Sequence, residues 1–180
     1  MRRHLKCEEF ERLCWELSRI VVDSGWQPTH LLTPVRGGPP VANFVHEYLR
    51  FRGIHPKYMV VDTNGYNDTQ QLETVEISGV DLLPGMTSAD RLLLVDDIFD
   101  TGRSVDALVS SLEERYSCDM PETRVASVFY KPTSREVDIE PDFFVEKTDK
   151  WIVFRHELMI DGQTSYPLDE LLEMKGNGFY

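Results

Sequence analysis

The stretch RLLLVDDIFDTGRS, residues 91–104, carries the strongest structural signal in the chain. Its first part, Arg91–Val95, is almost continuously apolar, which is typical of a strand buried on both faces of a parallel sheet. Two adjacent carboxylates, Asp96 and Asp97, end this predicted strand. A short loop then leads into a predicted helix that begins at Ser104 and continues to about Tyr116. A strand that passes through a loop into a helix is the repeating unit of α/β domains.

The regions on either side alternate in the same way between strand and helix patterns. Further strands are predicted at Leu31–Val35, Tyr58–Val61, Val125–Tyr130, Phe143–Val145 and Trp151–Phe154. Further helices are predicted at Phe10–Val21 and from about Pro39 to Leu49, with one or two weak helical turns at Leu168–Met174. Each of the longer helices has one apolar stripe with the spacing of a helix face. The sequence therefore predicts an α/β fold with a mostly parallel sheet flanked by helices.

One long segment, residues 62–90, interrupts this alternation. It is polar and turn-rich, apart from an alternating piece around Leu72, Val75 and Ile77. Long segments of this kind inside a compact domain are either disordered or functional lids. Both possibilities stay open from the residues alone, and a lid over Asn64–Ser88 is what the family resemblance described below implies.

Composition limits the possible classes of protein. A chain of 180 residues with 41% hydrophobic residues predicts a single domain, residues 1–180. The net charge of −12 argues against nucleic acid as a partner. Three cysteines without close spacing argue against disulfides and zinc sites. No apolar run approaches the length of a membrane span or follows a basic start, so we expect a cytoplasmic protein that does not bind membranes.

The loop after the central strand has the chemistry of a phosphate site. A helix start offers unpaired N–H groups and partial positive charge, and Gly102 lets the backbone come close to a ligand. The hydroxyls of Thr101 and Ser104 can donate to phosphate oxygens. The acid pair could accept hydrogen bonds from a vicinal diol or enter a magnesium shell, and Asp100 could act as a general base. The simpler alternative is that Asp100 or Thr101 only caps the helix.

The whole string from Val95 to Ser104 resembles the motif that binds phosphoribosyl pyrophosphate (PRPP) in type I phosphoribosyltransferases. The resemblance implies that residues 101–104, including Arg103, hold the 5′-phosphate and that Asp96 and Asp97 hold the ribose hydroxyls and Mg²⁺. It also implies a core at about residues 25–135. A small hood would be formed by about residues 1–24 and the base-binding part at 136–180.

Three further matches resemble the 6-oxopurine branch of that family. Asp100 resembles the acid that, in this branch, handles the proton on purine N7. Lys131, after the strand Val125–Tyr130, implies a donor to the 6-oxo group. Trp151 is similar in position to the aromatic residue that stacks on the purine in this branch. Ile152 is similar in position to the next residue, whose backbone reaches the 2-position edge of the purine.

The same resemblance extends to the pyrophosphate and the metal. Arg36-Gly37-Gly38 resembles the loop that grips the leaving group, where the family often has a strained peptide. Glu157 implies a ligand for a second magnesium. Arg155 and His156 depart from the Pro-Trp of bacterial xanthine–guanine and archaeal-like members, which leaves the choice of purine open.

The resemblance therefore implies transfer of phosphoribose from PRPP to hypoxanthine, guanine or xanthine, with a nucleoside 5′-monophosphate and pyrophosphate as products. Relatives are commonly dimers or tetramers, so a homodimer or homotetramer is expected. Two alternatives stay open: a non-catalytic regulator that binds PRPP, and a transferase for another base. Retention of Asp100, Lys131 and Trp151 favours an enzyme for purines.

Overall fold

The six-stranded sheet of the computed structural model has the order β4-β3-β2-β5-β6-β7. The structure describes residues 2–67, 70–154, 159–160 and 163–164. The sheet strands are β2 (His30–Val35), β3 (Lys57–Asn67), β4 (Gln70–Ser78), β5 (Arg91–Phe99), β6 (Glu122–Tyr130) and β7 (Phe143–Lys147). All neighbouring pairs are parallel except β3–β4, which is antiparallel. The predicted α/β fold with a mostly parallel sheet is confirmed.

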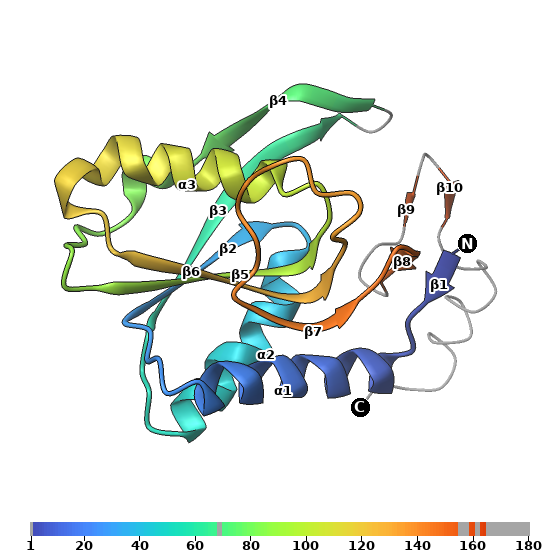
Figure 1. Cartoon of the computed structure of the whole chain (residues 1–180), viewed down its shortest axis with the longest axis horizontal. Coiled ribbons are helices and arrows are strands. Elements are labelled where there is room, and N and C mark those ends of the chain that lie inside the picture. The colour runs from blue at the N-terminus through green and yellow to red at the C-terminus, as the bar shows by residue number, and fades with distance from the viewer. Residues whose placement is uncertain (1, 68–69, 155–158, 161–162, 165–180) are drawn as a thin grey trace, which may run out of the picture.

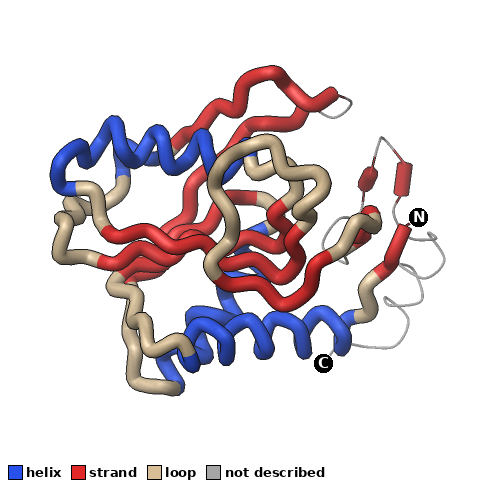
Figure 2. Tube along the Cα trace, in the orientation of Figure 1, coloured by secondary structure: helices blue, strands red, loops and turns tan. Residues whose placement is uncertain are grey.

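Helices cover both faces of this sheet (Figure 1). Helices α1 (Cys7–Asp23) and α2 (Gly38–Phe51) lie on one face, and α3 (Arg103–Tyr116) lies on the other, so the molecule has three layers (Figure 2). Each pair of layers encloses its own apolar cluster. Leu17, Val45 and Phe129 are fully buried in the cluster under α1 and α2. Leu94 and Leu108 lie in the cluster under α3.

Within the residues expected to form the hood, the structure has two small sheets of two strands each. Strand β1 (Arg2–His4) pairs in parallel with β8 (Trp151–Val153), and β9 (Met159–Ile160) pairs with β10 (Gln163–Thr164). These strands lie together at one end of the molecule (Figure 1). Helix α1 and strand β7 belong instead to the layers of the main sheet, although the sequence placed both in the hood. The apolar stripe of α1 is buried against that sheet, which is why the helix lies there.

Strand β5 is longer than predicted and includes both acids. Its pairing with β6 continues past the acid pair, as Ile98 lies opposite Phe129 and Phe99 opposite Tyr130. Phe99 is only 1% exposed, so its burial extends the strand beyond the polar interruption. Asp96 and Asp97 thus lie within the strand and do not follow it.

The predicted lid is a β-hairpin followed by an anchored segment. The alternating piece became strand β4, which pairs with β3. Beyond Gly79 the chain is fixed to the end of α3, where Arg115 donates to the Leu83 carbonyl at 2.5 Å and the Tyr116 hydroxyl donates to the Pro84 carbonyl at 2.7 Å. These contacts fix the second part of the segment to the main layers, and the lid role of the hairpin stays a prediction. The short helices η1 (Val80–Leu82) and η2 (Ser117–Asp119) complete the described elements, and the predicted turns at Leu168–Met174 lie outside the described residues.

The cysteines provide a test of the packing of α1. Burial raises the pKa of the Cys14 thiol to about 12, whereas Cys7 and Cys118 are exposed. A thiol reacts as its thiolate, so an alkylating reagent at pH 8 should label Cys7 and Cys118 but not Cys14 in the folded protein. Peptide mass spectrometry after labelling measures this, with the denatured protein as the control in which all three react. Rapid labelling of Cys14 in the folded protein would contradict the packing of α1.

Candidate active site

Three strands that are neighbours in the sheet end next to predicted site residues. Arg36 follows β2, Asp100 follows β5 and Lys131 follows β6. Because these strands are parallel, their carboxyl ends lie at the same edge of the sheet. This is the edge at which open α/β sheets bind ligands.

The structure brings Asp100, Lys131 and Trp151 together. The Lys131 ammonium lies 2.5 Å from a carboxylate oxygen of Asp100 and 5.6 Å from the centre of the Trp151 ring. Lys131 is 7% exposed, whereas the Trp151 side chain is 48% exposed. A buried cation thus connects a candidate proton acceptor to an aromatic face that is open to solvent.

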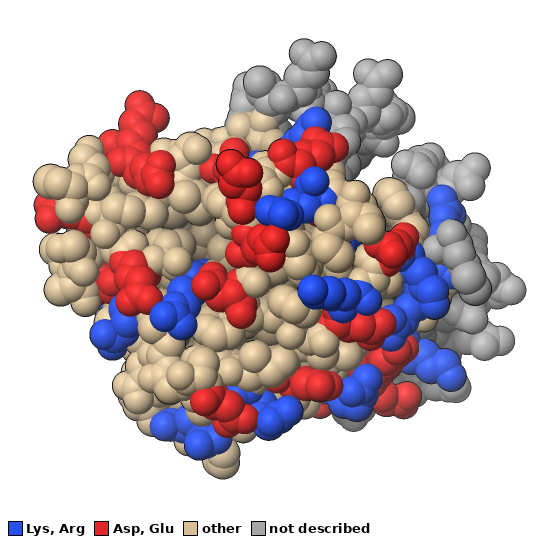
Figure 3. All heavy atoms as spheres, in the orientation of Figure 1, with Lys and Arg blue, Asp and Glu red and all other residues tan. Residues whose placement is uncertain are grey.

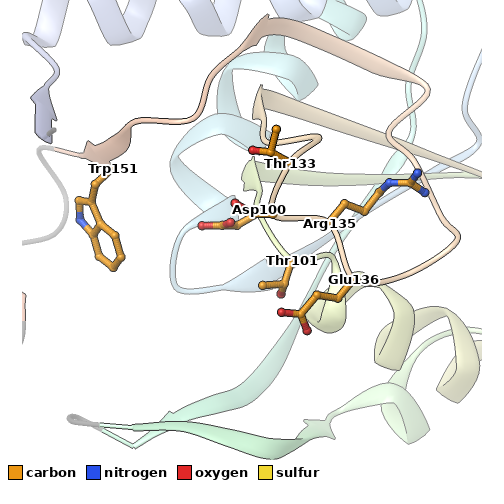
Figure 4. Close-up of a pocket in the computed structure, with 7 residues that line it drawn as sticks. Asp100, Thr101, Thr133, Arg135, Glu136 and Trp151 are labelled. Carbon is orange, nitrogen blue, oxygen red and sulfur yellow. The ribbon is translucent and has the colours of Figure 1, made fainter.

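A cavity of about 540 Å³ opens beside this group. It is lined by Asp100, Thr101, Thr133, Ser134, Arg135, Glu136 and Trp151. Figure 4 shows the Asp100 carboxylate directed toward the Trp151 side of the cavity, while the Glu136 carboxylate lies next to Thr101. Residues predicted to contact a base, Asp100 and Trp151, and a residue predicted to contact a phosphate, Thr101, therefore line the same cavity.

The loop at residues 101–104 packs closely against neighbouring parts of the protein at Gly102. Gly102 is the N-cap of α3 and has a φ of +81°, and as a glycine it has no side chain that could cap the helix. The Thr101 hydroxyl accepts a hydrogen bond from the Arg103 N–H at 3.4 Å, so Thr101 contacts the helix start as the simpler alternative expects, whereas Asp100 pairs with Lys131. A Cβ on Gly102 would lie 2.5 Å from Val137 and 2.7 Å from Phe99, so only glycine fits. The first N–H groups of α3, including that of the partly buried Ser104, begin directly after this turn.

The loop after β6 is fastened to the phosphate loop. The backbone N–H of Glu136 donates to the Thr101 carbonyl at 2.9 Å, and the Glu136 carboxylate pairs with Arg103 at 2.5 Å. Arg135 is engaged farther along the same loop, with the carboxylate of Glu140 at 3.0 Å. Sequence reasoning missed residues 133–136 because they show no periodic pattern. Their position directly after Lys131, at a strand end, was the available signal.

The acid pair lies behind the loop that follows β2. All three terminal atoms of the Asp97 carboxylate lie within 2.7 Å of the place that a Cβ of Gly37 would occupy, and Asp97 is 5% exposed. Burial and the nearby charge of Asp97 raise the pKa of Asp96 well above its ordinary value.

The Val35–Arg36 peptide is cis. Arg36 is exposed and pairs with no acid of the described chain.

The Ile152 side chain is 5% exposed and packs in the core. This agrees with the prediction that Ile152 contacts a base through its backbone, and that contact stays a prediction. Glu157 lies outside the described residues. Within the described ranges, no cluster of three or more His, Cys, Asp or Glu residues is arranged to hold a metal. In the same ranges, no helix has the length and apolarity of a membrane span.

Comparison with known proteins agrees with this geometry. Residues 5–161 match the Phosphoribosyl transferase domain family. The chain belongs to the phosphoribosyltransferase family. A hypoxanthine-guanine phosphoribosyltransferase of Cricetulus griseus is 38% identical over 89 residues, which cover 49% of this chain and 39% of that relative. The chain thus aligns with well under half the length of this curated phosphoribosyltransferase.

Solved structures show the same fold. A xanthine-guanine-hypoxanthine phosphoribosyltransferase of Helicobacter pylori superposes with a TM-score of 0.69 at 21% identity, over 98% of this chain and 99% of that one. A hypothetical protein of Neisseria gonorrhoeae with bound ppGpp superposes with a TM-score of 0.74 at 17% identity, over 98% and 96% of the two chains. The fold is therefore that of the type I phosphoribosyltransferases.

Proposed function

We propose that this chain is an enzyme that transfers the phosphoribosyl group of PRPP to a 6-oxopurine base. The products would be a nucleoside 5′-monophosphate and pyrophosphate, as in purine salvage. The observation that carries the proposal is that Asp100 and Trp151 line one cavity, with Lys131 in contact with both, beside a glycine-capped helix start. A purine stacked on Trp151 would place its 6-oxo group near the Lys131 ammonium.

The reaction is a displacement at ribose C1. A purine ring nitrogen forms the new bond to C1 while the bond to the pyrophosphate oxygen breaks, and the base loses its N7 proton. Asp100 is placed to accept or relay that proton. The N–H groups at residues 102–104 and the Thr101 hydroxyl would hold the 5′-phosphate. Arg36, a cation without an acidic partner in the described chain, would stabilise the leaving pyrophosphate.

The acid pair fits magnesium by the chemistry of its donors. Mg²⁺ in proteins commonly takes one or two carboxylates together with substrate phosphates. Asp96 and Asp97 would hold it, and Glu157 remains a predicted second ligand. When bound, the ion would neutralise charge on the pyrophosphate. The hairpin β3–β4 lies beside this edge of the sheet and would exclude water from the reacting sugar (Figure 1).

The alternatives differ in what they require. A non-catalytic regulator would bind PRPP, or a nucleotide such as that held by the Neisseria protein, without turnover. Regulators that act on nucleic acid need a basic surface, whereas acidic and basic side chains are interspersed on the face shown in Figure 3. A transferase for another base would not need both Lys131 and Trp151. Cytoplasmic location, a homodimer or homotetramer, and the absence of nucleic acid and membrane partners stay predictions.

The base can be identified by testing which bases the protein converts to nucleotides. We expect the protein with PRPP and Mg²⁺ to convert hypoxanthine, guanine or xanthine, and to leave adenine and orotate unchanged, when nucleotides are separated chromatographically. If only orotate or only adenine is converted, the proposed 6-oxopurine substrate is wrong and that base takes its place. Tight binding of PRPP without turnover of any base would favour the regulator.

Removal of the Trp151 ring should weaken binding of the base and leave binding of PRPP almost unchanged. For Trp151→Ala we expect the KM for the base to rise about tenfold or more, because stacking of a base on an aromatic contributes roughly 1–3 kcal/mol. The KM for PRPP should change little. Trp151→Phe serves as the control that keeps an aromatic face, and steady-state kinetics with each substrate varied measures both constants. Equal loss for both substrates would contradict a specific role in base binding.

A further inference from the structure

Three cations at or beside the cavity, within the described residues, are each paired with a carboxylate. Lys131 pairs with Asp100 at 2.5 Å, Arg103 with Glu136 at 2.5 Å, and Arg135 with Glu140 at 3.0 Å. The second of these pairs lies at the phosphate loop, because Arg103 is the residue after Gly102. The phosphate loop therefore has an anion beside it before any ligand arrives.

We propose that Glu136 sets the affinity of the phosphate subsite by acting as the counter-ion of Arg103. Glu136 lines the cavity, and its carboxylate lies next to Thr101 (Figure 4). A phosphate bound at Thr101 must therefore compete with Glu136 for the Arg103 guanidinium and tolerate a negative charge nearby. The inference rests on the proposed function, since it assumes that residues 101–104 receive a 5′-phosphate.

The backbone around Glu136 does not depend on its carboxylate. The N–H of Glu136 donates to Thr101, and Val137 packs beside Gly102. Glu136→Gln keeps both contacts and removes only the charge. The change therefore tests electrostatics without removing the wall of the cavity.

The consequence for the reaction concerns product release. A phosphate site that holds every phosphorylated ligand tightly would retain the nucleotide product, and product release often limits turnover. Glu136 weakens the bound state of both PRPP and nucleotide. Arg103 and Glu136 are 41% and 46% exposed, so water and salt reduce the effect without removing it.

The test is a comparison of ribose 5-phosphate binding by calorimetry at low ionic strength. Glu136→Gln should bind it about threefold to tenfold more tightly than the wild type, and this gain should shrink in high salt. Glu140→Gln is the matched control, because Glu140 neutralises Arg135 on the same loop but does not line the cavity. It should bind as the wild type does. Arg103→Gln added to Glu136→Gln should abolish the gain.

Other results would overturn the proposal. Weaker or unchanged binding in Glu136→Gln would show that the carboxylate positions Arg103 for the ligand or has no influence on it. An equal gain in Glu140→Gln would indicate general charge and not Arg103. Failure of the proposed function is seen separately, in wild-type turnover of PRPP with a base. The binding comparison can succeed without turnover, and turnover can occur without the predicted gain.

Discussion

Asp100→Ala is expected to lower kcat/KM with the preferred oxopurine by about a hundredfold to ten-thousandfold, the usual contribution of a positioned acid or base. Asp100 lies at the end of β5, beside Lys131 and the cavity, where a base proton would be released. Steady-state kinetics at saturating PRPP measures the loss. Asp138→Ala is the control, since Asp138 is an exposed acid on the loop after β6.

The alanine variant has a second effect that must be separated from catalysis. Lys131 is 7% exposed, and removal of Asp100 leaves its charge without that partner. Asp100→Asn keeps a hydrogen-bond acceptor for Lys131 but cannot take a proton. Both variants should lose turnover while retaining PRPP binding. Near wild-type turnover in Asp100→Asn would rule out a proton-transfer role for Asp100.

Gly102→Ala is expected to combine a loss of stability with a loss of PRPP binding. A left-handed conformation costs a residue with a side chain about 1–2 kcal/mol, and overpacking costs typically about 1–3 kcal/mol more. The added Cβ would lie 2.5 Å from Val137, so the loop must shift away from the geometry that receives a phosphate. Denaturant unfolding and PRPP titration measure the two losses.

Gly25→Ala is the matched control for that variant. Gly25 has a φ of +75° and nothing within 4 Å of an added Cβ, so it should show only the conformational cost. The difference between the two variants isolates the contacts with Val137 and Phe99. Equal destabilisation of both, with PRPP binding intact in Gly102→Ala, would contradict the close packing of the phosphate loop.

The layers and the position of the site could be predicted from the sequence because they depend on local patterns. Continuous apolarity marked β5, and one-sided stripes marked the helices. The acids after Val95 lie within β5 because strand pairing with β6 continues through them, a long-range effect. The anchoring of residues 80–86 depends on Arg115 and Tyr116, some thirty residues away. No local pattern contains that information.

Some residues of the site could be predicted from local motifs, whereas others depend on long-range contacts. Asp100, Lys131 and Trp151 could be found because each matches a family motif at the end or start of a strand. Glu136 was missed although it follows Lys131 closely, because its contact with the phosphate loop arises from the turn that returns residues 133–136 to Thr101. Burial of the Ile152 side chain could not be predicted either, because β8 pairs with β1, which lies at the other end of the described chain.

The central claim is transfer of phosphoribose at this cavity, and its most direct test is the stoichiometry of one reaction. The protein is incubated with PRPP, Mg²⁺ and guanine, hypoxanthine or xanthine, and the nucleotide and pyrophosphate formed are measured together, beside a sample without base. We expect equal amounts of nucleotide and pyrophosphate, and almost no pyrophosphate without base. Consumption of PRPP without nucleotide, or no consumption with any base, would contradict the assignment of this site as a phosphoribosyltransferase centre.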